Sequence, residues 1–164
     1  MRYLLIVVLF LLSVFVGFIF FNKFAKRKKF FSALIMLAEK LSVDINFSRE
    51  RLKVLIENFD KSTKQNLLGV DEGFLNYLDK RVELDEKEIF KSASLLKKEE
   101  KEFVLLFLKT LGRSDVENQT KEIASFLKRF EDMGAKCNAE YKKYGTLSLK
   151  LGVICGLFFA VVLF

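Results

Sequence analysis

The sequence predicts an all-α protein, in which an antiparallel helical bundle lies between two transmembrane helices. An uncharged apolar run covers residues 3–21, and a second apolar run, interrupted only by Lys150, covers residues 147–164. All 21 acidic residues lie between the two runs, together with 26 of the 28 basic residues, all except Arg2 and Lys150. The chain also contains no proline, which removes the strongest helix breaker.

The first apolar run has the length of a membrane span, because a helix needs about 20 apolar residues to cross the hydrocarbon core. A signal peptide is the rival interpretation, and it would end in a small-x-small cleavage site. Asn22, Lys23 and Phe24 follow the run instead. We therefore predict an uncleaved N-terminal transmembrane helix over residues 1–22.

The second apolar run predicts a C-terminal transmembrane helix over residues 145–164. Lys150 lies near its start, where a long side chain can reach the headgroups. The alternative is a buried core helix of a soluble protein. That alternative is disfavoured because the run has no polar face.

Small residues recur every four positions in the second span, at Ser148, Gly152, Gly156 and Ala160. Ser13 and Gly17 form a shorter stripe in the first span. Small residues at this spacing share one helix face and let another helix approach closely. We expect the two spans to pack together, or the second span to pair with a partner. Glycine is also simply common in transmembrane helices.

The basic residues beside the spans predict the orientation. Only Arg2 precedes the first span, whereas Lys142 and Lys143 precede the second. A membrane-proximal basic cluster follows the first span, at Lys26, Arg27, Lys28 and Lys29. The excess of positive charge predicts a cytoplasmic middle domain over residues 23–144, with both termini outside. The cluster is also expected to contact anionic lipids. Nucleic-acid binding is disfavoured, since no basic helix face carries exposed aromatics.

The middle domain has about 120 residues, which is the length of one small domain. Helical spacing of apolar residues continues from the first span through the basic cluster to Ile45. Ser48 predicts the cap of a second helix, which ends near Phe59. Residues 61–73 are predicted to form turns, because Gly69 and Gly73 interrupt them.

The later helices of the domain are more apolar. Residues 102–112 are apolar nearly all round, which predicts a central helix that ends at Gly112. A last helix is predicted from residue 115, and its apolar stripe continues into the second apolar run as far as Cys155. Unbroken, it would be about 75 Å long. Gly134 and Gly145 are its expected soft points.

No catalytic or cofactor motif is present, and histidine, the usual general base, is absent. We therefore predict no enzyme activity, no cofactor and no metal site. Acidic runs such as Glu99 to Glu102 alternate with lysine, which favours a solvated helix face over a metal site. On one continuous helix Cys137 and Cys155 would be about 27 Å apart, too far for a disulfide.

A helix–helix corner is predicted where Gly112 ends one helix and Asp115 caps the next. Gln119 lies one turn into the new helix and could bond back across the corner. A structural joint explains these residue types better than a binding site does. The corner comprises Leu111, Gly112, Asp115 and Gln119.

The order of these motifs resembles the stage III sporulation protein AB family, over nearly the full length. The family's LG-x-x-D-x-x-x-Q-like corner falls on Leu111 to Gln119, and its terminal LG-x-x-x-G span on Leu151, Gly152 and Gly156. The VDINF patch at residues 43–47 also fits the family pattern. Leu108 departs from it, since a glycine is expected there.

The resemblance implies a function. Such proteins belong to the channel between mother cell and forespore, and their bundle is similar to the F domains of type II secretion and type IV pilus platforms. It implies a platform in the mother-cell membrane around the forespore. Its expected partners are the secretion-type ATPase of the complex (stage III sporulation protein AA), other stage III A channel proteins and membrane lipids, with no nucleic acid.

Three hypotheses compete from the sequence. A platform would bind the ATPase through an exposed patch of the bundle, for which residues 71–81 are the candidates. A membrane-anchored adaptor or sensor unrelated to secretion would need an outside ligand domain, and the outer ends are a residue or two long. A membrane-bound enzyme would need catalytic residues that the motifs do not supply.

Overall fold

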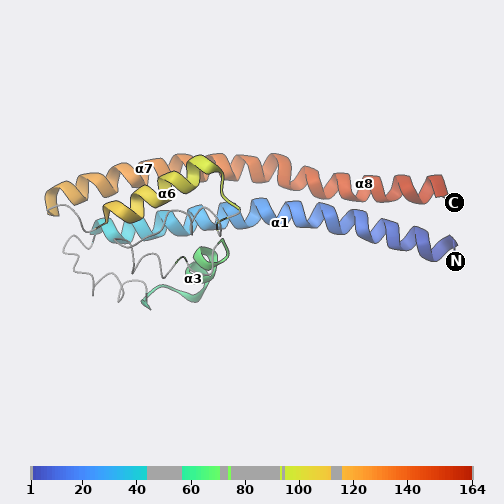
Figure 1. Cartoon of the computed structure of the whole chain (residues 1–164), viewed down its shortest axis with the longest axis horizontal. Helices are drawn as coiled ribbons and strands as arrows, with labels where there is room; N and C mark the ends of the chain where they lie inside the picture. Colours follow the sequence, from blue (N-terminus) through green and yellow to red (C-terminus); the bar gives the residue numbers. More distant parts are fainter. Residues whose placement is uncertain are drawn as a thin grey trace. The chain divides into compact units, whose positions relative to one another are not determined.

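The computed structural model of the chain describes residues 2–43, 57–70, 74, 93, 95–111 and 116–163 (Figure 1). Every regular element within these residues is helical, which confirms the predicted all-α class. The elements are α1 (Arg2–Val43), α3 (Lys61–Leu68), α6 (Lys98–Thr110), α7 (Val116–Glu140), the π-helical segment η1 (Tyr141–Gly145) and α8 (Thr146–Leu163).

The chain forms two compact units. The two-helix unit comprises Met1–Lys28 and Lys136–Phe164, and the bundle unit comprises Lys29–Ala135. The predicted limits of the cytoplasmic domain, residues 23 and 144, lie inside the two-helix unit and stay a prediction.

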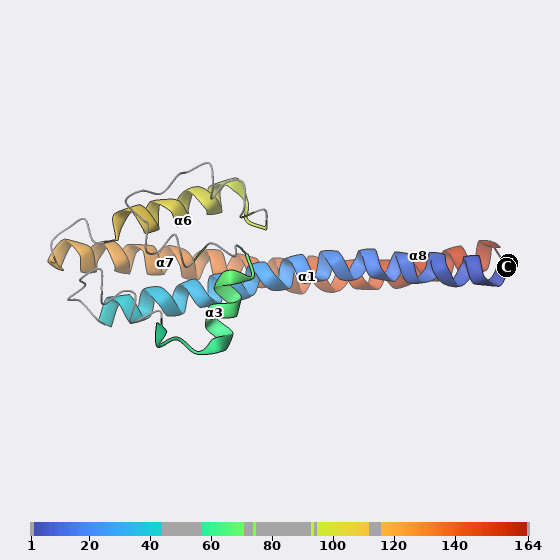
Figure 2. The ribbon, with the colours of Figure 1, turned by 60° about the horizontal axis from the view of Figure 1, so that its bottom comes forward.

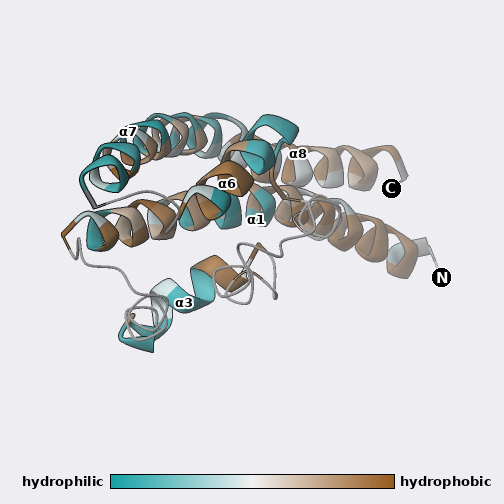
Figure 3. Ribbon diagram, turned by 60° about the vertical axis from the view of Figure 1, so that its left-hand side comes forward, coloured by the Kyte–Doolittle hydropathy of each residue, from teal (hydrophilic) through white to brown (hydrophobic). Residues whose placement is uncertain are grey.

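In the two-helix unit the first part of α1 and α8 lie side by side and antiparallel (Figures 1 and 2). Their outer faces expose large apolar side chains: Leu4 is 70% exposed, Ile154 60% and Phe158 64%. Figure 3 shows the hydrophobic colouring of both helices. Two helices of the described chain are long and apolar enough to cross a membrane. Exposure of these faces disfavours a buried core helix and suits contact with lipid tails.

The helices at both ends of the chain continue beyond the apolar runs. The 42 residues of α1 continue from the apolar run through the basic cluster, as the apolar spacing predicted. The chain is helical without a break from Val116 to Leu163, with η1 between α7 and α8. Gly145 lies in η1, whereas Gly134 lies in regular α-helix, where an added Cβ would be 3.1 Å from Ile35 Cδ1.

The bundle unit has an aromatic and aliphatic core, to which α6 and α7 contribute a phenylalanine cluster. The rings of Phe107 and Phe130 are edge-to-face at 5.1 Å, and the rings of Phe103 and Phe126 also lie 5.1 Å apart. Both Phe107 and Phe130 are fully buried. The C-terminal part of α1 adds the fully buried Phe30, Phe31, Leu34 and Leu37. Large side chains therefore supply the buried area that stabilises this unit in water.

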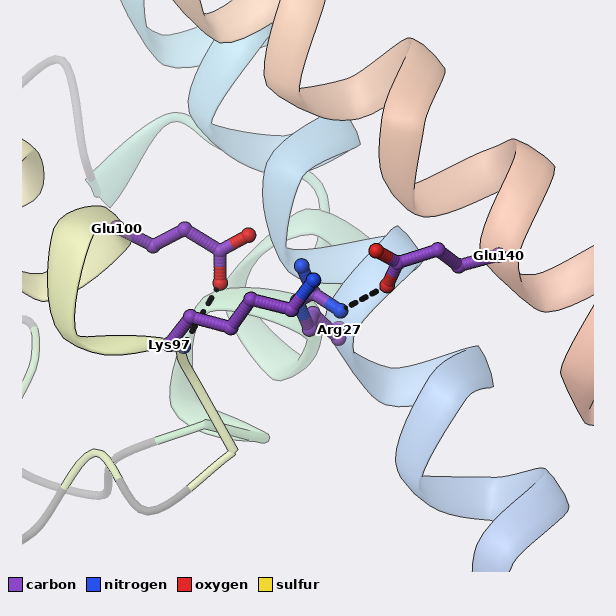
Figure 4. Close-up of polar contacts among 4 residues, drawn as sticks. All are labelled: Arg27, Lys97, Glu100 and Glu140. Atoms are coloured by element: carbon purple, nitrogen blue, oxygen red, sulfur yellow. Dashed lines mark hydrogen bonds and ion pairs between the residues drawn. The ribbon is translucent and has the colours of Figure 1, made fainter.

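The helix α6 is less uniformly buried than its composition predicted. Leu106 is 54% exposed, because it lies on the face opposite the buried Phe107 and Leu108. Leu108, the departure from the family pattern, fills part of the core. At the helix start Glu100 Oε2 accepts a hydrogen bond from the Lys97 backbone N–H at 2.9 Å (Figure 4). This bond satisfies an N–H that has no partner within the helix.

The prediction of turns over residues 61–73 is wrong for its first part, because Lys61–Leu68 forms α3. Asp60 caps this helix, accepting a hydrogen bond from the Thr63 N–H at 2.9 Å. The Thr63 hydroxyl also bonds the carboxylate, and together these bonds lower the pKa of Asp60. Leu67 is fully buried. A cap and one buried apolar anchor outweigh the weak helix propensity of this polar stretch.

Candidate functional site

The interface between α1 and α8 is built on close backbone contact. A Cβ added at Gly17 would be 2.8 Å from the Ser148 carbonyl oxygen and 3.2 Å from Gly152 Cα. A Cβ added at Gly152 would be 2.9 Å from the Ser13 carbonyl oxygen. Real Cβ atoms essentially never lie within 3.0 Å of such atoms, so a side chain at Gly17 or Gly152 would force the two backbones apart.

A hydrogen bond crosses the same interface. Ser13 Oγ donates to the Gly152 carbonyl oxygen at 2.8 Å. Ser148 Oγ instead donates to the Tyr144 carbonyl oxygen of its own helix at 2.6 Å. Polar bonds between helices in an apolar surrounding fix their register, because few other partners are available there.

The second glycine of the stripe, Gly156, packs on an aromatic ring. A Cβ added at Gly156 would be 2.7 Å from Phe10 Cδ2. Ala160, the last of the stripe, is half-buried. The structure therefore places Ser148, Gly152 and Gly156 against α1.

The four residues of the basic cluster on α1 differ in exposure, because they lie on different faces of the helix. Lys26 and Lys29 are exposed, and Lys28 is half-buried. Arg27 is buried and forms an ion pair with Glu140 of α7 (Figure 4). The side chains of Arg27 and Glu140 are only 7% and 24% exposed. Arg27 therefore serves the helix interface rather than the open lipid contact expected for the whole cluster.

Sequence reasoning missed Glu140 as a partner. The register that sets Ser13 beside Gly152 and Gly17 beside Ser148 also brings Arg27 to Glu140. That register could have been found by aligning the two small-residue stripes in antiparallel orientation. That alignment would have placed Glu140, the single acidic residue of residues 136–150, opposite the basic cluster.

Aromatic rings form a layer next to this ion pair. The Phe21 and Tyr141 rings lie 5.4 Å apart, and the Phe24 and Tyr144 rings 6.3 Å apart. Lys28 Nζ lies 5.1 Å from the centre of the Tyr141 ring. Tyrosine and lysine at the end of an apolar span are typical of the membrane–water interface.

The π-helical segment η1 carries both tyrosines and ends at the buried Gly145. A Cβ added at Gly145 would be 3.2 Å from Tyr141 Cδ2 and 3.6 Å from Phe24 Cβ. The glycine therefore leaves room for the rings of Tyr141 and Phe24. Single π-turns are rare and frequently lie at functional positions.

Other predicted positions lie in or next to the bundle. Leu111 and Gln119 are 4% and 7% exposed. The rest of the predicted corner, Gly112 and Asp115, falls outside the described residues. So do the VDINF residues Asp44, Ile45 and Phe47 and all but Phe74 of the candidate docking patch at residues 71–81.

The described residues bring together no group of three or more His, Cys, Asp or Glu side chains that could hold a metal ion. Cys137 and Cys155 are both free thiols. Ser13, Arg27 and Lys28 of α1 make a hydrogen bond, an ion pair and a cation–π contact with the C-terminal helices. This arrangement positions helices.

The fold and this interface define a helical membrane protein, with a bundle unit and a pair of closely packed apolar helices. The comparison with known families is more specific: the family model of stage III sporulation protein AB matches residues 2–164. The chain therefore belongs to the stage III sporulation protein AB family, and is a sporulation-related membrane protein. This family is not a known enzyme family. No curated protein and no solved structure matches the chain.

Proposed function

We propose that this protein is a non-catalytic platform of the secretion-like channel between mother cell and forespore. In this role it couples a cytoplasmic secretion-type ATPase to the membrane complex. The bundle faces the cytoplasm, both termini lie outside, and the protein resides in the mother-cell membrane around the forespore. Stage III sporulation protein AA is the proposed ATPase, and other stage III A proteins are the proposed membrane partners.

One observation carries the proposal beyond family membership: helices continue from the bundle unit into the two-helix unit. Residues 29–43 of α1 belong to the bundle unit and its earlier residues to the two-helix unit. The helical run from Val116 to Leu163 likewise belongs to both units. A continuous helix is a stiff connection, so a force on the bundle can reach the membrane helices without a flexible linker.

The likeness of the bundle to F domains of type II secretion and type IV pilus platforms is part of the same proposal. It rests on the family resemblance and on the bundle's helical content. It predicts that the bundle binds the ATPase through a face that includes residues 71–81.

The docking half of the proposal is tested by capture of the ATPase on the full-length protein in detergent micelles. We expect saturable binding at low salt. A variant carrying Asp71→Lys, Glu72→Lys and Asp79→Lys should bind less, and the matched control is Glu117→Lys with Glu131→Lys on the exposed face of α7. Failure of the wild-type chain to bind at low salt would exclude direct docking.

The coupling half is tested by an insertion after Gly145. Seven Gly and Ser residues should leave both spans inserted and the ATPase bound, but abolish sporulation. The matched control inserts seven helix-forming residues of Glu, Ala and Lys, which add about two turns and keep the facing of α8. Both insertions shift Ser148 and Gly152 along α1 by the same number of residues, so the comparison isolates helix continuity, and we expect more spores with this control than with the Gly-Ser insertion. Sporulation with the Gly-Ser insertion would show that a rigid connection is unnecessary.

A further inference from the structure

A dense group of exposed lysines surrounds the end of the helix pair. Residues 22–28 and 136–150 contain eight basic residues and a single acidic one, Glu140. Five of the exposed members flank the cytoplasmic end proposed for the apolar runs: Lys23 and Lys26 from α1, and Lys136, Lys142 and Lys143 from α7 and η1, while the exposed Lys150 lies inside the second run. We call these five residues the lysine collar. All five lie within the two-helix unit.

The collar keeps its positive charge because the only carboxylate of these segments is engaged elsewhere. Glu140 contacts the buried Arg27 in an ion pair that faces the helix interface. Its charge is therefore offset by Arg27. The lysines remain a net positive surface, which attracts anions from solution or from a membrane.

The aromatic layer places this surface at the depth of lipid headgroups. The Tyr141 ring is tilted against Phe21 and the Tyr144 ring stacks on Phe24, at the cytoplasmic end proposed for both apolar runs. Lys143 Nζ lies 5.1 Å from the centre of the Tyr144 ring. Amphipathic rings settle at the interface of a bilayer, and the ammonium groups beside them then lie among the phosphates.

From these observations we infer that the lysine collar binds anionic phospholipid headgroups, with lysines of α1 and of the C-terminal helices acting on the same leaflet. This inference does not depend on the ATPase. The site recognises a phosphodiester with no compensating choline or ethanolamine cation, held at the membrane surface by its acyl chains. A free phosphate lacks those chains, which would lie along the apolar faces of α1 and α8.

The test uses the full-length protein in micelles of an uncharged detergent. The salt concentration is about 0.15 M, at which attraction between distant charges is screened. Binding of dioctanoyl phosphatidylglycerol, dioctanoyl phosphatidylcholine and glycerol 3-phosphate is measured by native mass spectrometry. We expect the phosphatidylglycerol to bind at least about tenfold more tightly than either of the others, since each lysine near an anionic surface contributes roughly fivefold.

Two double variants divide the collar by helix: Lys23→Gln with Lys26→Gln, and Lys142→Gln with Lys143→Gln. Each should weaken phosphatidylglycerol binding by about an order of magnitude and leave phosphatidylcholine binding unchanged. The matched control is Lys61→Gln with Lys128→Gln, two exposed lysines of the bundle unit, and it should change neither. Circular dichroism checks that each variant is folded.

Several results would overturn the inference. Equal affinity for the two lipids would remove the charge selectivity. Glycerol 3-phosphate binding as tightly as the lipid would indicate a phosphate site without a membrane component. An equal loss in the control variant would indicate a general effect of net charge. A loss confined to one collar variant would show that the two sides do not act together.

Discussion

The two units of this protein hold their helices together by opposite means. In the two-helix unit the contact is made by the smallest residues, with Gly17 and Gly152 backbone against backbone and one hydrogen bond from Ser13. In the bundle unit it is made by the largest, with Phe107 and Phe130 ring against ring. The same α1 helix takes part in both units, so the change follows the surroundings and not the helix.

The difference follows from the surroundings of each unit, because water and lipid tails favour different kinds of packing. In water, burying a phenylalanine removes apolar surface from an unfavourable contact, so bulk is stabilising. Lipid tails are as apolar as leucine, so a large side chain gains little free energy when it moves from contact with lipid into a helix interface. Helices in lipid are held instead by close van der Waals contact and by polar bonds. This view predicts opposite responses to a change of side-chain size.

The largest expected effect comes from removing bulk in the bundle. Phe107→Ala deletes a fully buried ring that contacts Phe126 and Phe130, and should destabilise the bundle by about 3–5 kcal/mol. The matched control is Leu106→Ala, next in sequence but 54% exposed, which should cost about 1 kcal/mol or less. Urea unfolding followed by circular dichroism measures both. Equal losses would mean that the ring cluster does not carry the stability of this unit.

The next effect comes from adding bulk between the two apolar helices. Gly152→Leu places a side chain where the Ser13 carbonyl oxygen and Gly17 Cα already lie, and should cost about 1–3 kcal/mol. It should also push α1 and α8 apart towards the 8–10 Å spacing of ordinary helix pairs. Ile154→Leu, at a lipid-facing position of the same helix, is the matched control.

The separation can be measured directly. Spin labels at Tyr3→Cys and Val162→Cys, both in the two-helix unit, report the distance between the helix ends once Cys137→Ala and Cys155→Ala remove the native thiols. Gly152→Leu should lengthen and broaden that distance, and Ile154→Leu should not. An unchanged distance in the glycine variant would contradict a backbone-contact interface.

A smaller effect is expected at the ion pair. Glu140→Gln removes the charge that faces the buried Arg27 and should cost about 1–2 kcal/mol, reduced from a fully buried pair because Glu140 is partly exposed. The double variant Arg27→Met with Glu140→Leu should recover much of this loss, since neither side chain then leaves a charge unpaired. Thermal unfolding in micelles measures both. A double variant less stable than the single one would show that the pair is itself stabilising.

Within the two-helix unit, the sequence predicts the helices and their small-residue faces but not the partner of Arg27. The apolar runs and their small-residue stripes follow from local composition, so the sequence predicts the helices and the faces on which Ser148, Gly152 and Gly156 lie. The partner of Arg27 depends on the register of two segments more than 100 residues apart. Local periodicity carries no such long-range information, and Arg27 therefore reads as one more residue of a solvated cluster.

One local misprediction has a different physical cause. The stretch from Lys61 to Leu68 reads as turn because its residues are polar, but the Asp60 cap and the buried Leu67 decide its structure. Gly145, one of the two expected soft points of the last helix, lies in the π-helical segment η1. Its neighbour Phe24 belongs to α1 and comes close only once the helix pair has formed, a contact that local periodicity does not contain.

The smallest effect concerns the interhelical hydrogen bond, and it tests how much polar contact adds to close packing. Ser13→Ala removes the donor to the Gly152 carbonyl oxygen without adding bulk, and should cost about 0.6 kcal/mol. Ser148→Ala is the matched control, because its hydroxyl bonds a carbonyl of its own helix. The unfolding free energies of the two variants are compared by raising the fraction of anionic detergent in micelles of an uncharged detergent. If Ser13→Ala and Ser148→Ala cost the same, the interhelical bond adds nothing specific, and glycine contact alone holds the helices.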